Sequence, residues 1–494
     1  MTTLQLISGN LSVALQNIAS FFTPDPSVPL VFSSGAFWLM FLVFLPIFAC
    51  IRHRKTQMML FVVAFSLFFA FKSCGWIFLL MVATSVIDWH LALRISRTEA
   101  KKARQLMLCA SLLCSVSILM VFKYTNFFML SWHEIVGGNF HPLAIIAPIG
   151  ISFYTFRTIS YVVDVYKGKM PPVESYLHYL FYLSFFPCLV AGPVVRAKDF
   201  MPQLERTTEV TKAEIYGGFW LVMVGVVKKA VIADYLAQYS SIIFGSPETL
   251  QGYSGFELLM AGIGFTVQLY ADFSGYSDMA IGLGAIMGFD LGVNFDHPFR
   301  SLNITEFWRR WHISLSGWFR DYLYIPLGGN RKGKARTWLN RFLVFFATGL
   351  WHGASWTFVL WGLWHGLFSV LEDCGAIPED KLKGKRIGQL YTLLVVVLGF
   401  TLFRADTLAQ AGAMYAAMFS GIGLHWPGTA AVWAKFTPAF ALTLCLALLL
   451  CTPVAREHTP KRESVTFIGS LGLLLLCMMY LAAGSFNPFI YFRF

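Results

Sequence analysis

Long blocks of apolar residues, separated by short polar and basic segments, dominate the sequence. Each block is close to the length that a helix needs to cross the hydrocarbon core of a bilayer, roughly 20 residues. A transmembrane β-barrel would alternate apolar and polar positions, whereas these blocks are continuous. The pattern predicts an all-α polytopic membrane protein with roughly 10–13 transmembrane or re-entrant helices.

The apolar blocks are not all regular. Residues 1–30 are interrupted by polar side chains and then by prolines, which predicts a short surface helix and a turn. Between residues 186 and 193, two prolines and a glycine predict a broken or re-entrant helix, which is tolerated at membrane depth only where it lines a cavity or is buried in protein. No repeat or second soluble region is visible, so we expect a single domain over 1–494. The other expected membrane segments are 31–51, a hairpin over 57–93, 105–130, 144–166, 214–236, two segments within 254–289, 342–350 onward, 355–372, 388–404, 432–452 and 465–484.

The 494 residues carry a formal net charge of +12 and are 57% hydrophobic and 17% aromatic. Lysines and arginines cluster in short loops between the apolar blocks, as the positive-inside rule describes for cytoplasmic loops. This clustering explains the charge without a nucleic-acid partner, and the basic cluster that begins at Arg52 would place the N-terminus outside. The nine cysteines are scattered without a CxxC pair, which argues against a zinc site or a disulfide framework. No basic residue precedes Arg52, so we expect no cleavable signal peptide.

Residues 295–366 hold the densest group of basic and aromatic side chains and form the expected catalytic core. The run TEFWRRWHISLS (305–316) is typical of a helix at the membrane interface, with arginine and tryptophan at the headgroup level. The run GLWHGASW (349–356) places His352 between two strongly apolar stretches. An ionisable side chain at membrane depth is costly, so it is by default a candidate for function.

His352 and His312 are the candidate catalytic residues. A neutral imidazole can take the hydroxyl proton in an acyl transfer, because imidazole titrates near the working pH. For His352 the alternative is a structural histidine inside the helix bundle, and for His312 it is an interfacial residue that contacts headgroups or caps a helix. Whether the two lie close together is open from the sequence, and His365, one span further on, is a weaker candidate.

Basic side chains next to His312 suit an acidic substrate. Arg309, Arg310 and Arg320 would bind the phosphates of a coenzyme A thioester, or an acyl carrier protein, because arginine binds phosphate bidentately. Trp308 lies in the same run and is assigned with them to donor binding. Anionic lipid is the alternative ligand for these arginines.

Five further polar side chains lie in apolar blocks. Asp272, Ser274 and Asp278 interrupt one block, where they would either position substrate or cap helices at a break. Arg157 stands seven residues before Asp164, which places both on one helix face two turns apart. A structural pair and a role of Arg157 in the donor site are both open.

Several of these stretches together resemble the membrane-bound O-acyltransferase family. The blocks occur in the family's order and are most similar to the branch that contains the membrane subunit of bacterial alginate O-acetylation. The resemblance rests on FWRRWHISLSGWFRDYLYIPLGGNRKG (307–333), GLWHGASW (349–356), PIGISFYTFRTISYVVDVYKG (148–168), FPCLVAGPVVRAKDFMPQL (186–204), DFSGYSDMAIGLGAIMGFDLGVNFDHPF (272–299) and NPFIYFRF (487–494).

This resemblance implies an activity and a set of partners. His352 would be the essential histidine and His312 its partner, in a tunnel whose wall includes Trp351. The donor would be a cytoplasmic thioester, either acetyl-CoA or an acyl carrier thioester, with no bound cofactor and no metal. The acetyl group would end on an extracytoplasmic polysaccharide such as alginate, through a periplasmic serine acyltransferase partner, at the inner membrane of a bacterium.

Two other functions are compatible with the sequence. The related D-alanyl transfer protein of teichoic-acid modification would use a carrier-protein donor, although that branch is typically shorter. A membrane transporter would also carry intramembrane charges and a broken helix, but no inverted repeat is visible. Cys188 could form an acyl-enzyme, yet its apolar surroundings disfavour a thiolate.

Overall fold

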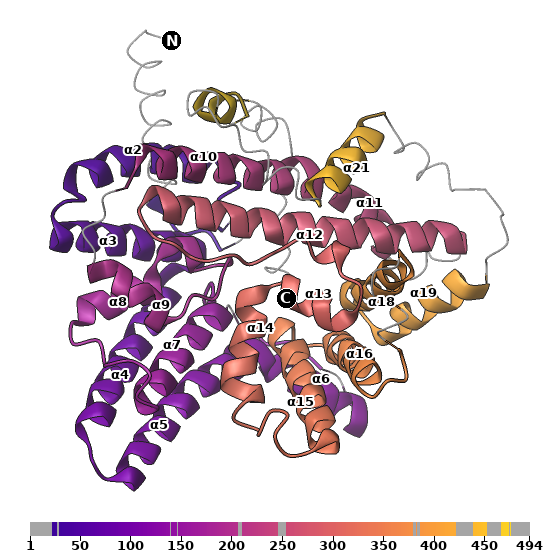
Figure 1. Cartoon of the computed structure of the whole chain (residues 1–494), viewed down its shortest axis with the longest axis horizontal. Coiled ribbons are helices and arrows are strands. Elements are labelled where there is room, and N and C mark those ends of the chain that lie inside the picture. The colour runs from indigo at the N-terminus through magenta and orange to yellow at the C-terminus, as the bar shows by residue number, and fades with distance from the viewer. Residues whose placement is uncertain are drawn as a thin grey trace. The chain divides into compact units, whose positions relative to one another are not determined.

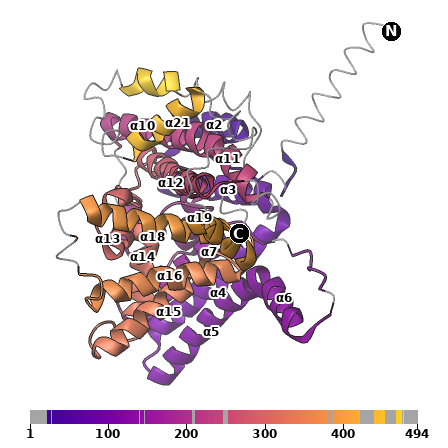
Figure 2. The ribbon, with the colours of Figure 1, turned by 90° about the vertical axis from the view of Figure 1, so that its right-hand side faces the viewer.

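Figures 1 and 2 show the computed structural model, which consists of helices joined by turns and loops. The chain forms two compact units: the first unit comprises 1–122 and 141–190, and the second unit comprises 123–140 and 191–494. The predicted all-α fold is confirmed, and the single domain over 1–494 stays a prediction. No strand occurs among the residues that the structure describes, which are 22–26, 29–138, 140–145, 147–205, 210–245, 253–378, 382, 386–420, 438–451, 466–473 and 475.

The described helices of the first unit are α2 (Gly35–Ile51), α3 (Lys55–Cys74), α4 (Phe78–Arg97), α5 (Lys101–Leu119), α7 (Ile151–Tyr166) and α8 (Tyr176–Ser184). A single turn that begins at Gly75, with φ at 62°, separates α3 from α4. α4 then packs against α5 and α7, whereas α3 packs against α8 (Figure 1). Both helices expected over 57–93 are therefore present, but the hairpin is wrong because the two diverge at Gly75 instead of packing along each other.

The segment after α8 has the irregular backbone that its prolines predict. It contains a short 3-10 helix, Phe186–Cys188, and no further helix until α9 begins at Ala197. Residues 185–195 are all buried, and the Phe186 N–H donates to the Ser66 hydroxyl at 3.2 Å. The predicted broken helix is confirmed, and its backbone is surrounded by protein, as irregular structure in a membrane requires.

The described helices of the second unit are α6 (Thr125–Val136), α9 (Ala197–Glu205), α10 (Lys212–Val226), α11 (Asp234–Phe244), α12 (Gly255–Ile286), α13 (Ile304–Arg310), α14 (Ile313–Phe319), α15 (Lys334–His352), α16 (Trp356–Asp373), α18 (Arg386–Arg404), α19 (Leu408–Ser420) and α21 (Pro438–Leu450). A π-helical stretch, Val227–Ala233, joins α10 to α11, and together they run beside α12 (Figure 1). Thr211 and Ser254 begin α10 and α12 with capping boxes, in which the glutamate three residues later bonds back to the cap. The sequence did not predict α19.

α12 is one continuous helix of 32 residues. We expected two segments with a break at their polar run, and this expectation is wrong. Asp272, Ser274 and Asp278 lie inside the helix, so they do not cap helices at a break. Lysines of the neighbouring π-helical stretch neutralise the carboxylates: Lys229 lies 2.7 Å from Asp272, and Lys228 lies 2.6 Å from Asp278. A paired carboxylate can remain in a regular helix at membrane depth.

Glycines set the distance between α10 and α12. A Cβ atom added to Gly282 would lie 2.5 Å from the carbonyl oxygen of Gly218, and one added to Gly218 would lie 2.8 Å from that of Gly282. Gly225 and Gly275 meet in the same way, at 2.5 and 2.7 Å. Small residues that let two backbones approach closely are typical of helix pairs in membranes.

α15, α16 and α18 lie side by side (Figure 2). The first two cross closely at Gly349 and Gly362. A Cβ atom on Gly349 would lie 2.3 Å from the carbonyl oxygen of Phe358, and one on Gly362 would lie 2.2 Å from that of Phe345. This crossing fixes the end of α15, where His352 stands one turn after Gly349.

Within the described residues, four helical stretches are long and apolar enough to cross a membrane: Lys55–Arg97, Lys101–Val136, Lys212–Phe244 and Arg386–Arg404. Together with the apolar but shorter α2, they make the chain a multi-pass membrane protein. The total of roughly 10–13 membrane segments stays a prediction. The surface helix expected within 1–30 and part of the span expected at 465–484 lie outside the described residues.

The α10–α12 crossing yields a stability prediction. Gly282→Ala should lower the unfolding temperature in detergent, because the new methyl group meets the α10 backbone and overpacking costs about 1–3 kcal/mol. Gly264→Ala is the matched control on the same helix, since its Cβ atom would meet nothing within 4 Å. An equal unfolding temperature for the two variants would contradict the close crossing.

Candidate active site

His312 occupies a break between two short helices. α13 ends at Arg310, Trp311 is extended, and His312 adopts a left-handed conformation with φ at 45° before α14 begins. The single interfacial helix expected over 305–316 is therefore wrong. A non-glycine residue held in this region costs about 1–3 kcal/mol, and such strain is concentrated at functional sites.

Asn294 holds the His312 imidazole from the side of Nδ1. The Asn294 Oδ1 lies 3.1 Å from His312 Nδ1 and also accepts hydrogen bonds from the Ser314 hydroxyl at 2.8 Å and the Ser314 backbone N–H at 3.3 Å. On its other side the Asn294 amide donates to the Ser277 hydroxyl at 3.0 Å. Asn294 is completely buried, so these bonds satisfy a side chain that has no access to water.

This network fixes the tautomer of His312. The Ser314 backbone N–H can only donate, so the Asn294 atom that faces it must be the oxygen. An oxygen accepts, and therefore the nitrogen of His312 that faces it, Nδ1, carries the hydrogen. The lone pair of the ring then lies on Nε2, which has no hydrogen-bond partner among the described residues.

His352 and His312 pack against the same indole ring. The Trp351 ring centroid lies 6.0 Å from that of His312 and 4.9 Å from that of His352. All three side chains are buried, with exposed fractions of 1% for His312 and 3% for His352. The structure thus brings together two candidate residues that are 40 positions apart in the sequence, and it places the predicted tunnel residue Trp351 between them.

A third histidine continues the aromatic cluster. Trp361 lies 4.9 Å from His352 and 5.3 Å from His365, measured between ring centroids. Trp308 lies 5.0 Å from His365 in the same way. His365 is fully buried, and neither of its ring nitrogens has a hydrogen-bond partner among the described residues. Through Trp361, His365 joins the cluster of His312, Trp351 and His352, and it also packs against Trp308.

Two side chains just before α6 cap the end of α15. The ammonium of Lys123 donates to the carbonyl oxygens of Trp351 and His352, the latter at 3.0 Å. The Tyr124 hydroxyl donates to the carbonyl oxygen of Leu350. The last carbonyls of a helix have no partner within the helix, so these contacts satisfy the backbone that carries His352.

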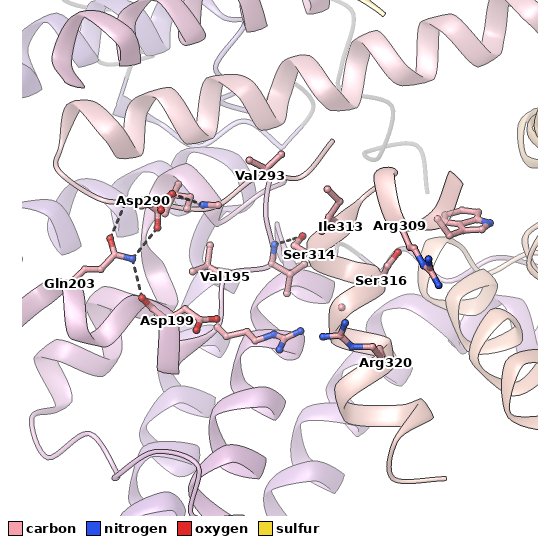
Figure 3. Close-up of a pocket in the computed structure, with 16 residues that line it drawn as sticks. Val195, Asp199, Gln203, Asp290, Val293, Arg309, Ile313, Ser314, Ser316 and Arg320 are labelled. Atoms are coloured by element: carbon pink, nitrogen blue, oxygen red, sulfur yellow. Dashed lines mark hydrogen bonds between the residues drawn. The ribbon is translucent and has the colours of Figure 1, made fainter. Parts of the chain in front are cut away.

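Figure 3 shows a cavity, of about 710 Å³. Trp308, which packs against His365, is one of its lining residues, so the cavity lies next to the histidine cluster. Its other lining residues come from the segment before α9, from α9 itself, from the loop after α12, and from α13 and α14 with the turn that follows α14. Figure 3 shows Arg309 and Arg320 on one side of it, and Gln203 with Asp199 and Asp290 on the other. The cavity is thus basic on the wall that continues into the histidine cluster.

The Asp321 carboxylate holds two of the arginines on the basic wall of the cavity. Asp321 forms ion pairs with Arg196 and, at 2.8 Å, with Arg320. Arg309 also lines the cavity. Burial raises the pKa of Asp321, but hydrogen bonds and charges from Arg320 and Arg196 outweigh it and hold the pKa below its usual range. The carboxylate therefore stays ionised near neutral pH, and the contacts are lost only as the pH falls through this lowered pKa.

The remaining predicted residues lie elsewhere. Arg310 does not line the cavity; it pairs with Glu306 at 3.0 Å and with Asp296 at 3.2 Å. Arg157 and Cys188 belong to the first unit. The Arg157 guanidinium donates to the carbonyl oxygens of Tyr182 and Leu183.

The α12 residues Asp272, Ser274 and Asp278 are also separate from the cavity lining. The two carboxylates are engaged in the lysine pairs described above. In the described part of the chain, there is no group of three or more histidine, cysteine or acidic side chains that could hold a metal ion.

Comparisons with known proteins identify the family of this chain. Residues 167–374 match the model of the membrane-bound O-acyltransferase family. The chain is 37% identical to the "Probable alginate O-acetylase AlgI" of Pseudomonas putida, over 94% of this chain and 100% of that protein. The chain belongs to the membrane-bound O-acyltransferase family. It is an enzyme, a membrane-bound O-acyltransferase, and not the transporter considered as an alternative.

Other relatives of this acyltransferase act on cell-wall polymers, by their names. The peptidoglycan O-acetyltransferase of Helicobacter pylori is 32% identical, over 88% of this chain and 90% of that protein. The teichoic acid D-alanyltransferase of Bacillus subtilis is 29% identical over 52% of this chain and 67% of that protein.

Three residues that the structure places in or beside the site of this acyltransferase were not predicted from the sequence. Lys123 is the only charged residue between Arg104 and His133, and an isolated lysine in an apolar span is a signal that could have found it. Asn294 and Arg196 lie within quoted family blocks, but nothing in their local sequence separates them from neighbouring polar residues. Their roles depend on contacts across the fold, with His312 and Asp321.

The hydrogen bond from His312 to Asn294 can be tested by substitution of Asn294. Asn294→Leu should lower the turnover number of the acyltransferase about 100-fold, since the imidazole loses the partner that fixes its tautomer and orientation. Asn294→Asp keeps an acceptor oxygen opposite Nδ1 and should retain more of the activity. The measurement is the initial rate of thioester consumption per folded protein.

Asn340→Leu is the matched control, because Asn340 is equally buried but its amide nitrogen donates to the carbonyl oxygen of Gly329 at 2.9 Å, whereas the Asn294 oxygen accepts from a candidate histidine. Equal losses in Asn294→Leu and Asn340→Leu would show that the effect of Asn294 is a general consequence of removing a buried amide.

Proposed function

We propose that this acyltransferase moves an acetyl group from a cytoplasmic thioester, acetyl-CoA, toward the hydroxyl groups of a polysaccharide outside the inner membrane of a bacterium. The single observation that carries the proposal is the packing of two buried imidazoles on Trp351, next to a cavity whose basic wall suits a phosphorylated donor. The names of the relatives in Pseudomonas putida and Helicobacter pylori support acetyl transfer to a polymer.

The chemistry needs one proton acceptor and a bound thioester. A histidine takes the proton of the acceptor hydroxyl, and the hydroxyl oxygen attacks the carbonyl carbon of the thioester. The carbon–sulfur bond then breaks, and the thiolate takes the proton back from the imidazolium, so an ester and a free thiol are the products. We assign this proton transfer to His352, which stands at the capped end of α15.

His312 has a different role in this scheme. In the tautomer that Asn294 fixes, its Nε2 can accept a hydrogen bond but cannot donate one to a thioester carbonyl. This tautomer therefore argues against a role of His312 in orienting the donor carbonyl. We assign to His312 the binding of a substrate hydroxyl or amide N–H, which orients the reactants against each other.

The basic wall would bind the donor. Arg309 and Arg320, with Arg196, present guanidinium groups to the cavity, and these bind phosphate groups through paired, charge-assisted hydrogen bonds. Trp308 lies between the cavity and His365, so a chain that extends from a bound nucleotide past this indole would approach the histidine cluster. No cofactor or metal is part of the scheme.

The acceptor would reach the site from the outer face. By the sequence resemblance, the acetyl group passes to a periplasmic serine acyltransferase partner and from there to an exopolysaccharide such as alginate. D-alanyl transfer from a carrier protein would use the same basic wall and the same histidines, so it is separated from acetyl transfer by the identity of the group found on the polymer.

The assignment of His352 as the proton acceptor can be tested by substitution. In cells, His352→Ala should reduce polysaccharide O-acetyl content at least about 100-fold, and His312→Ala should leave a measurable residue of activity. His53→Ala, an exposed histidine in the turn between α2 and α3, is the control. The protein level in the membrane must match among the variants. Full acetylation with His352→Ala would overturn the proposal.

Binding of the donor by the basic wall of the cavity can be tested in the same way. Arg320→Gln should raise the KM for acetyl-CoA about tenfold, the loss expected for one charge-assisted hydrogen bond. Arg310→Gln is the matched control in the same basic run, because Arg310 pairs with carboxylates and does not line the cavity. If both variants bind the donor equally well, the cavity is not the donor site.

A further inference from the structure

Lys123 is an isolated charge within an apolar helical stretch. The stretch Lys101–Val136 is long and apolar enough to cross a membrane, and Lys123 is the only charged residue between Arg104 and His133. An ionisable residue at this depth is costly and is retained where it has a function and a named partner. The partner here is the end of the helix that carries His352.

The contacts of Lys123 differ from those of the other lysines inside the second unit. Lys228 and Lys229 pair with aspartates at 2.6 and 2.7 Å. Lys123 has no carboxylate partner among the described residues, and its ammonium donates to the carbonyl oxygens of Trp351 and His352. A cation at the C-terminal end of a helix is also attracted by the helix dipole, so the ammonium holds this helix end more firmly than a neutral donor such as glutamine or serine would.

The position of the ammonium relates it to both histidines. It lies 5.9 Å from the centroid of the Trp351 ring, the ring against which His312 and His352 pack. Lys123 belongs to a π-helical turn, Met120–Tyr124. Such turns are rare and are often found at functional sites, because the widened backbone redirects side chains. Lys123 therefore contacts the backbone of one candidate residue and the ring that both share.

We propose that Lys123 is a positioning residue for acyl transfer: its ammonium holds the backbone of Trp351 and His352 and thereby fixes the His352 imidazole relative to the bound thioester. This inference rests on the proposed function. Tyr124, which donates to the Leu350 carbonyl oxygen two residues earlier, supports the same helix end without a charge. Because Lys123 does not line the cavity, it acts on turnover and leaves donor binding unchanged.

The test uses the full chain in nanodiscs and measures thiol release from acetyl-CoA in the presence of the periplasmic serine acyltransferase partner and the acceptor polysaccharide. Lys123→Met should lower kcat at least tenfold with the KM for acetyl-CoA within twofold of the wild type. Lys123→Arg should restore more than half of kcat, and Lys123→Gln, which can satisfy one carbonyl without a charge, should lie between. Lys72→Met should have no effect, because Lys72 donates to the carbonyl oxygen of Thr23 outside the second unit.

Several outcomes separate this inference from the function on which it rests. If His352→Ala abolishes thiol release while Lys123→Met and Lys123→Gln keep kcat within twofold of the wild type, the inference is wrong and the proposed function stands. If His352→Ala releases thiol like the wild type, the proposed function fails and the inference fails with it. Should Lys123→Met not insert, Lys123→Gln decides. A rise in KM with unchanged kcat would also overturn the positioning role.

Discussion

Polar groups inside a membrane have no water to bond with, so each one needs a partner from the protein. The second unit meets this requirement in three places. Lysines pair with the carboxylates of α12, an asparagine bonds to an imidazole and to two serines, and a lysine and a tyrosine cap the end of α15. Two of these three arrangements end on a candidate catalytic histidine, so the satisfaction of polar groups and the construction of the site are closely connected.

Close helix crossings give the polar groups their positions. Glycines allow α10 to approach α12 and α15 to approach α16 until backbone atoms are nearly in contact. In a membrane there is little hydrophobic driving force between helices, so this close packing contributes much of the association. The crossing of α10 with α12 positions the Ser277 hydroxyl, which accepts a hydrogen bond from Asn294. The crossing of α15 with α16 positions the end of α15. A loosened crossing would therefore displace the histidines as well as destabilise the bundle.

Much of the fold and part of the site could be predicted from the sequence. Block length and continuity predicted a helical membrane protein, and two prolines predicted the broken segment after α8, because both depend on local physics. The break expected in α12 was wrong because Lys228 and Lys229, some 40 to 50 residues away in the chain, neutralise its carboxylates. The interfacial helix at 305–316 was wrong for a similar reason, since Asn294 holds His312 in a conformation that no local propensity favours.

The site, like the fold, could be predicted only where the local sequence decides. His352 was visible as an imidazole in an apolar run, and the arginines as a basic cluster, but the sequence could not show which arginines face a cavity. The structure places Arg309 and Arg320 in the cavity wall and Arg310 in ion pairs away from it, although Arg309 and Arg310 are adjacent in the chain. Helix geometry and pairing decide between neighbours of identical chemistry.

The central claim is that His312 and His352 act in one site on one reaction. A double-mutant cycle on the turnover number tests it most directly, with His312→Ala, His352→Ala and the double variant compared at equal folded concentration. Residues that act as a unit are strongly non-additive. The account predicts that the double variant is no slower than His352→Ala alone. If the two losses multiply, the histidines contribute independently and the shared site is contradicted.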